Sequence, residues 1–178
     1  RMLFVVVAIA ALLAVAAVVQ ATPIEEPAAQ PSLWQDVNEE ALTPTGERWI
    51  VPDRYRVVAL DLAQLQTSLD RAPLENSDAA RTDSAIMSLP LPDGSFGRFR
   101  IVESPIMEPG LAAKFPEIKT YLGQGVDDPT AVTRFDQTPA GFHAMIRSSS
   151  GTIFIDPYQR GDTQHYLVYD KRDYRDPE

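Results

Sequence analysis

Two histidines are the first candidates for chemistry in this chain, because imidazole serves both as a metal ligand and as a general base. His143 and His165 lie in separate predicted strands, and no HExxH motif or other zinc-binding spacing contains them. His143 alternates with Phe142, Ala144 and Ile146, a pattern that predicts a histidine on the solvent face of a strand. The alternative, a metal ligand, has no second ligand at a suitable spacing.

The remaining polar runs are weaker candidates. The run DDP at residues 127–129 has too few spaced oxygen ligands for calcium and favours a turn. The run SSSG at residues 148–151 lacks the context of a serine nucleophile, and the pair Gly123 and Gly125 is too little for a phosphate loop. The absence of cysteine excludes disulfides, thiolate zinc sites and a cysteine nucleophile. We therefore predict no catalytic residue, no metal ligand and no cofactor in this chain.

The charge and composition of the chain limit the kinds of binding partner that are expected. The 178 residues carry a net charge of -9, with 25 acidic and 16 basic side chains, and the basic residues are scattered. Nucleic-acid-binding proteins gather Lys and Arg on one face, so a nucleic-acid partner is not expected. The hydrophobic content of 44% is sufficient for a folded core.

The first 21 residues resemble an export signal. Arg1 precedes an apolar run from Leu3 to Val19, and a small-residue cleavage site ends at Ala21. This pattern predicts a signal peptide over residues 1–21 and a secreted or periplasmic protein, which contacts the membrane through this segment alone. An uncleaved anchor is the alternative, although the run is slightly shorter than the ~20 apolar residues of a membrane span.

A proline-rich linker is predicted over residues 22–48, because Pro23, Pro27 and Pro31 stand among Ala and Glu residues that cannot form a core. Trp34 is either an anchor of this tail on the domain or a partly exposed aromatic. A β-rich domain is then expected over residues 49–174.

Within that domain the elements are short. Residues 54–60 favour a strand, and Asp61 can cap a helix whose apolar stripe is Leu62, Leu65 and Leu69. A second short helix is expected after Pro109.

The rest of the domain alternates apolar and polar residues. The dipeptide Asp93-Gly94 predicts the turn of a hairpin over residues 89–102. Its first arm contains Pro90 and Pro92, which cannot donate to a ladder, so this arm is expected either at a sheet edge or with its proline nitrogens facing outward. Short strands at hairpin spacing follow from residue 130 onward. The predicted fold is mostly β with one or two short helices (α+β), arranged as an antiparallel meander of hairpins.

Three phrases carry a family resemblance: RWIVPDRYRVVALDLAQLQTSL, LPLPDGSFGRFRIVESPIMEPGLAAKFPEIKTYLGQGVDDPTAVTRFDQTPAGFHAMI and GTIFIDPY. Together they resemble the N-terminal, propeptide-like region of bacterial secreted reprolysin-type (adamalysin-like) zinc metalloproteases. The segment after residue 120 also resembles the β-meander of animal adamalysin pro-domains, in which a Tyr-x-Gly-type turn precedes an extended strand. The resemblance covers roughly residues 49–174.

The resemblance implies a pro-region that assists folding of a zinc metalloendopeptidase and holds it latent. The zinc ion and its HExxHxxGxxH helix are expected in a catalytic domain downstream of residue 178, and that domain is the expected partner. Many animal pro-domains block the zinc with a cysteine, whereas this chain has none, so any inhibition must use surface contacts or a group other than a thiol. The alternative is a stand-alone exported β-rich binding or adhesion module.

Two sets of residues are hypothesised to serve this function. The hairpin over residues 89–102, with Arg98, Phe99 and Arg100, or the hairpin over residues 142–155, forms a docking surface by strand addition. Processing is expected after Ala21 and at the dibasic pair of Lys171 and Arg172, for which a solvated charge run is the alternative.

Overall fold

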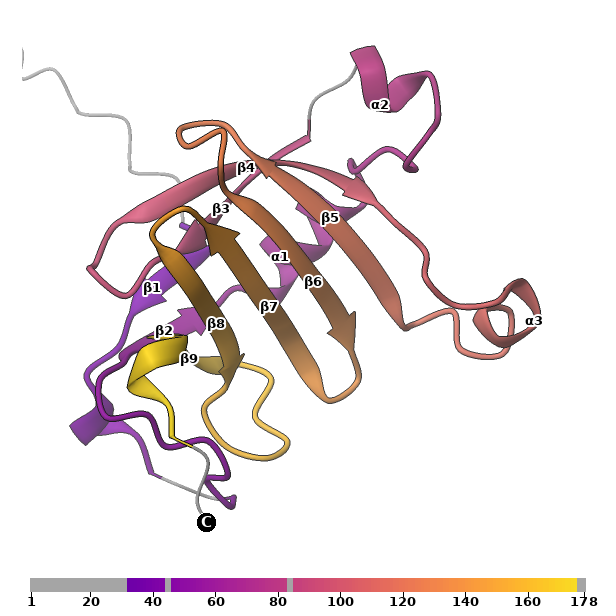
Figure 1. Cartoon of the computed structure of the whole chain (residues 1–178). Helices are drawn as coiled ribbons and strands as arrows, with labels where there is room; N and C mark the ends of the chain where they lie inside the picture. The colour runs from indigo at the N-terminus through magenta and orange to yellow at the C-terminus, as the bar shows by residue number, and fades with distance from the viewer. Residues whose placement is uncertain (1–31, 44–45, 83–84, 176–178) are drawn as a thin grey trace, which may run out of the picture. The chain divides into compact units, whose positions relative to one another are not determined.

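The computed structural model describes residues 32–43, 46–82 and 85–175, all within one compact unit. Nine antiparallel strands form one sheet in the order β1-β2-β9-β8-β7-β6-β5-β4-β3 (Figure 1). The strands are β1 Trp34–Asp36, β2 Arg56–Leu60, β3 Ala85–Pro90, β4 Phe96–Glu103, β5 Lys119–Gly125, β6 Val132–Thr138, β7 Gly141–Ser148, β8 Gly151–Pro157 and β9 His165–Asp170. The helices are α1 Leu62–Leu69, α2 Ala79–Thr82 and α3 Pro109–Ala112, with the 3-10 turns η1 Glu39–Ala41 and η2 Lys171–Asp173. The predicted mostly-β meander with few short helices is confirmed.

Strands β3 to β8 each pair with the next strand along the chain, so the sheet is a meander over most of its width. The predicted hairpin is present: β3 and β4 pair, and Gly94 in the turn has a φ of 91° that glycine adopts without strain. Strand β3 ends the sheet, as the prolines predict.

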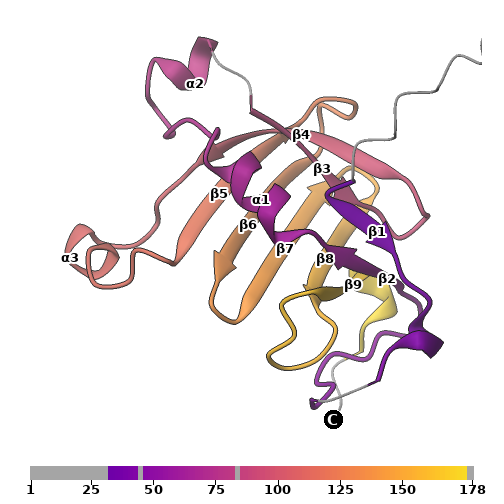
Figure 2. The same cartoon turned by 180° about the vertical axis from the view of Figure 1, so that it is seen from behind.

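The two ends of the sheet meet. The indole Nε1 of Trp34 in β1 donates to the carbonyl of Ser88 in β3 at 3.1 Å. Arg56 in β2 donates to the carbonyls of Leu91 and Ser95 beyond β3, each at 3.0 Å. Both views place β1 beside β3 (Figures 1 and 2). Side chains therefore bridge the gap between these edges, and the sheet curls around its inner face.

Aromatic residues fill the inner face. Tyr121 and Phe135 stack with centroids 4.9 Å apart, and Trp34 meets Phe142 and Tyr166 edge-on at 5.4 and 5.6 Å. All five side chains are almost fully buried, and such contacts add to the free energy gained by burial. This aromatic cluster is the centre of the core.

Helix α1 lies across the same inner face, where Figure 2 shows it in front of the sheet. The Asp61 carboxylate accepts from the backbone N–H groups of Ala63 and Gln64, each at 3.0 Å, as the sequence predicts for a cap. Leu65 and Leu69 point into the core, whereas Leu62 remains 38% exposed. The apolar stripe of the helix is thus narrower than expected.

The predicted linker over residues 22–48 is wrong for its second half. Trp34 is 1% exposed, and β1 pairs with β2. Residues beyond β1 also contribute to a second cluster on the outer face, where Val37, Leu42, Ile50 and Tyr55 pack against a core around Leu167. The folded unit therefore begins before residue 49, with Trp34 as its anchor.

The expectation of a Tyr-x-Gly-type turn is also wrong, because Tyr121 and Gly123 lie inside β5. A Cβ at Gly123 would stand 2.6 Å from Cγ2 of Thr133, so β5 and β6 pack too closely for any side chain there. The glycine serves close packing, whereas the sequence pattern suggested a turn.

The predicted signal segment, with Ala21, lies outside the described residues. In the part of the chain that is described, no helix has the length and apolar character needed to cross a bilayer.

Candidate binding surface

The outer face of the sheet has two halves. The half formed by β2, β9 and β8 is covered by Val37, Leu42, Ile50, Tyr55 and Tyr174. Over the other half, formed by β4 to β7, Figure 1 shows no described segment in front of the strands. Its outward side chains are Arg98, Arg100, Val102, Leu122, Gln124, Val132, Arg134, Met145 and Arg147. We call this half the open face.

The structure separates the three residues predicted to dock. Arg98 and Arg100 are exposed on the open face, as the hypothesis requires. Phe99 is 2% exposed and belongs to the core, so its assignment to the docking surface is wrong. The reason is the two-residue period of a strand, which turns Phe99 inward between two outward arginines.

Arg98 is held in place by the loop after β5. Its Nη2 lies 2.5 Å from Oδ1 of Asp127, and its Nε donates to Oδ2 at 3.0 Å. Hydrogen bonds and charge from Arg98 lower the pKa of the Asp127 carboxyl. The carboxyl of Asp128 accepts from both the backbone N–H and the hydroxyl of Thr130, at 2.8 and 2.7 Å. The acidic run is therefore a turn, as predicted.

Two arginines that the sequence analysis did not single out lie in the middle of the open face. Arg134 in β6 and Arg147 in β7 line a hollow of about 460 Å³. The alternation in each strand could have revealed them, because Thr133, Phe135 and Ile146 face the core and their neighbours must face outward.

Next to this hollow along β6 and β7, a row of polar side chains crosses the outer face of the sheet. The ring Nδ1 of His143 in β7 lies 3.1 Å from Oδ1 of Asp136 in β6, directly opposite. This hydrogen bond raises the pKa of His143. In β8, burial raises the pKa of Asp156, which accepts a 2.9 Å hydrogen bond from the hydroxyl of Tyr169. His143 lies on the outer face as predicted, and no group of three potential ligands for a metal occurs among the described residues.

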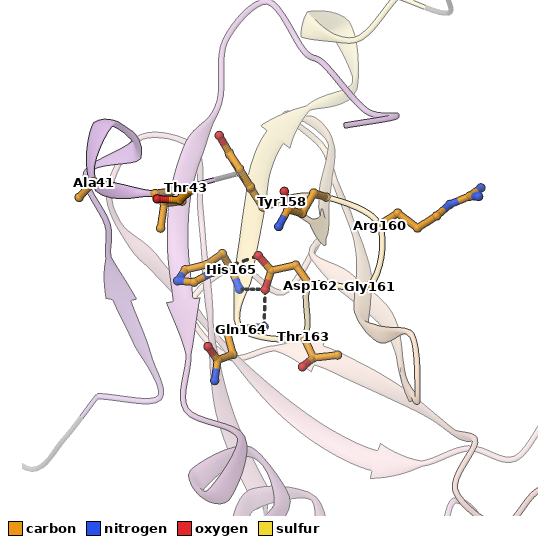
Figure 3. A pocket seen from close by; sticks show the side chains of 11 residues that line it. Ala41, Thr43, Tyr158, Arg160, Gly161, Asp162, Thr163, Gln164 and His165 are labelled. Atoms are coloured by element: carbon orange, nitrogen blue, oxygen red, sulfur yellow. Dashed lines mark hydrogen bonds and ion pairs between the residues drawn. The ribbon is translucent and has the colours of Figure 1, made fainter. Parts of the chain in front are cut away.

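The second histidine lines a polar pocket of about 370 Å³ between residues 41–43 and the loop 158–165 (Figure 3). One carboxylate oxygen of Asp162 accepts from the backbone N–H groups of Gln164 and His165, each at 2.9 Å. The other oxygen lies 3.0 Å from Nδ1 of His165. Asp162 thus holds both the backbone of this loop and the ring of His165 in place.

The proposed dibasic processing site is on the surface. Lys171 and Arg172 are exposed, and they lie in η2 directly after β9. Asp170 caps this turn through the backbone N–H of Arg172 at 3.1 Å and pairs with its guanidinium at 2.9 Å. Cleavage there would require the turn to open.

Comparison of the chain with models of protein families, with curated proteins and with solved structures found no match in any of the three.

Proposed function

We propose that this chain is the N-terminal pro-region of a secreted zinc metalloendopeptidase, and that it assists folding of the protease domain and keeps it latent by surface contact. The resemblance of residues 49–174 suggests the family. The observation that favours a contact mechanism is the open face, where exposed arginines stand among Val102, Leu122 and Met145 with no described segment over them.

This arrangement suits the binding of another protein. Interfaces combine buried apolar contacts with a few charged groups, and arginine and methionine are enriched in them. The zinc ion in this proposal belongs to the downstream domain and not to this chain.

The structure also changes the proposed mode of docking. Strand addition needs free backbone groups along an edge, but the carbonyl of Ser88 in β3 already accepts from Trp34. We therefore propose docking through the open face rather than through the edge of the hairpin. The rigid meander beneath it keeps the face in shape.

The first test extends the reading frame past Glu178 in search of an HExxHxxGxxH helix, and then titrates the full chain against the encoded protease domain. We expect inhibition of peptidase activity, weakened by about tenfold in the charge reversal Arg98→Glu/Arg100→Glu because two arginines of the face are lost. The double variant Arg71→Glu/Lys114→Glu has the same net charge and changes two exposed residues elsewhere, so it should inhibit like the wild type.

Two results would count against this proposal. A reading frame that stops at Glu178 would remove the partner and favour the stand-alone binding or adhesion module. A protease domain that folds and works equally with and without the chain would contradict a role in folding and latency.

A further inference from the structure

The hollow between β6 and β7 combines an apolar floor with two guanidinium groups. It is lined by Thr130, Val132, Arg134, Met145, Arg147 and Ser148. Val132 is 38% exposed and Met145 is half-buried. These two side chains offer an apolar contact on an otherwise polar stretch of the sheet.

The strand register brings the two arginines together. Val132 pairs with Arg147, and Arg134 pairs with Met145, so the arginines occupy diagonal positions on one face. Diagonal neighbours in an antiparallel pair are about 7–8 Å apart, which is within the reach of two arginine side chains toward a common anion.

These arginines differ from most others in the fold. Arg54, Arg56 and Arg98 each bind an aspartate. Among the described residues, neither Arg134 nor Arg147 has an ion pair or a hydrogen bond from its side chain. Two neighbouring like charges without a counterion cost stability, although acidic residues are plentiful in this chain. The fold itself gains nothing evident from this pair, which points to an anion from outside.

We propose that the hollow binds an acidic segment of the partner protein, in which an Asp or Glu carboxylate neighbours an apolar side chain. The carboxylate would accept forked hydrogen bonds from Arg134 and Arg147, which suit its planar shape. The apolar neighbour would pack on Val132 and Met145, and the flexible thioether adapts to different shapes. This inference rests on the proposed function, because it takes the downstream protease domain to be the protein that carries the acidic segment.

A nucleic acid suits the hollow less well. Nucleic-acid surfaces need a continuous basic track along the phosphates, whereas here the two arginines flank an apolar floor in a chain of net charge -9. An acidic peptide matches both the charge and the apolar contact.

The test uses two probes on the full chain. The first is a synthetic peptide, acetyl-Leu-Asp-Glu-Leu-amide, compared with its uncharged counterpart acetyl-Leu-Asn-Gln-Leu-amide. Binding of each peptide is measured by the changes in the NMR shifts of the Met145 methyl group and the arginine Nε–H groups. We expect shifts with the acidic peptide alone, and weaker binding as salt rises from about 0.05 M to about 0.5 M. The second probe is the separately expressed protease domain.

Matched variants then identify the residues. The reversal Arg134→Glu/Arg147→Glu should abolish peptide binding and weaken binding of the protease domain by about tenfold or more. Arg134→Lys/Arg147→Lys keeps the charge but loses the fork, so it should weaken binding severalfold. The double variant Arg71→Glu/Lys114→Glu is the control and should bind like the wild type. Urea unfolding of each variant checks that the fold is kept.

The outcomes separate this inference from the proposed function. Equal shifts with both peptides, or none with either, would overturn the acidic-segment site. Unchanged affinity of the protease domain for the Arg134→Glu/Arg147→Glu variant would also overturn it while leaving the pro-region role intact. Conversely, specific peptide binding without any binding of the protease domain would support the hollow and contradict the proposed function.

Discussion

At the scale of single residues, His143 gives a pH-dependent contribution to stability. Its hydrogen bond to Asp136 raises the pKa of the folded state above the unfolded value of about 6.5. The stabilisation is therefore fully present below about pH 6.5 and is lost as the pH rises through the raised folded pKa. We expect His143→Gln to lower the free energy of unfolding by about 0.5–1 kcal/mol at pH 6, because the pair is partly exposed, and by less at pH 8.5.

Urea unfolding at a series of pH values measures this difference, and Asp136→Asn is the matched control. Removing the carboxylate of Asp136 should remove most of the pH dependence of the His143→Gln effect, because its hydrogen bond is the main cause of the raised pKa of His143. The charge of Asp156 also raises this pKa but contributes less, and the Asp156 carboxylate accepts a hydrogen bond from the hydroxyl of Tyr169. A difference between wild type and His143→Gln that stays constant from pH 6 to about pH 8.5 would contradict the assignment.

At the scale of elements, the sequence predicted what local patterns control. The capped helix α1, the Asp93-Gly94 hairpin and the meander after residue 130 follow from capping, turn chemistry and alternation, and all are present. Strand β1 was missed because its three residues are held by Trp34 reaching Ser88, a contact 54 residues apart in sequence. The hollow was missed for a related reason, since cross-strand register brings Arg134 and Arg147 together.

Strand β5 was missed because its glycines looked like turn residues. Since a Cβ at Gly123 would lie 2.6 Å from Cγ2 of Thr133 and 3.2 Å from Cβ of Phe99, we expect Gly123→Ala to destabilise the fold by about 1–3 kcal/mol. Lys119→Ala, at the exposed start of the same strand, loses one surface ion pair with Glu103 and should cost less than about 1 kcal/mol. Equal urea midpoints for the two variants would argue against close packing as the role of the glycine.

At the scale of the whole molecule, residues 34–43, which precede the predicted domain boundary at residue 49, are part of the fold. They supply Trp34, and they supply Glu39, whose carboxylate accepts hydrogen bonds from Tyr55 and Tyr158 at 2.8 Å each. A chain beginning at residue 49 loses these groups and leaves the carbonyl of Ser88 without its donor. Loss of a buried tryptophan alone costs about 3–5 kcal/mol, a large part of the usual 5–15 kcal/mol free energy of unfolding of a domain.

We therefore expect a chain of residues 32–178 to unfold cooperatively in urea, and a chain of residues 49–178 to have a much lower midpoint or no cooperative transition. Trp34→Ala in the full chain should reproduce much of this loss, and equal midpoints for the two truncated chains would show that the fold begins at residue 49 after all.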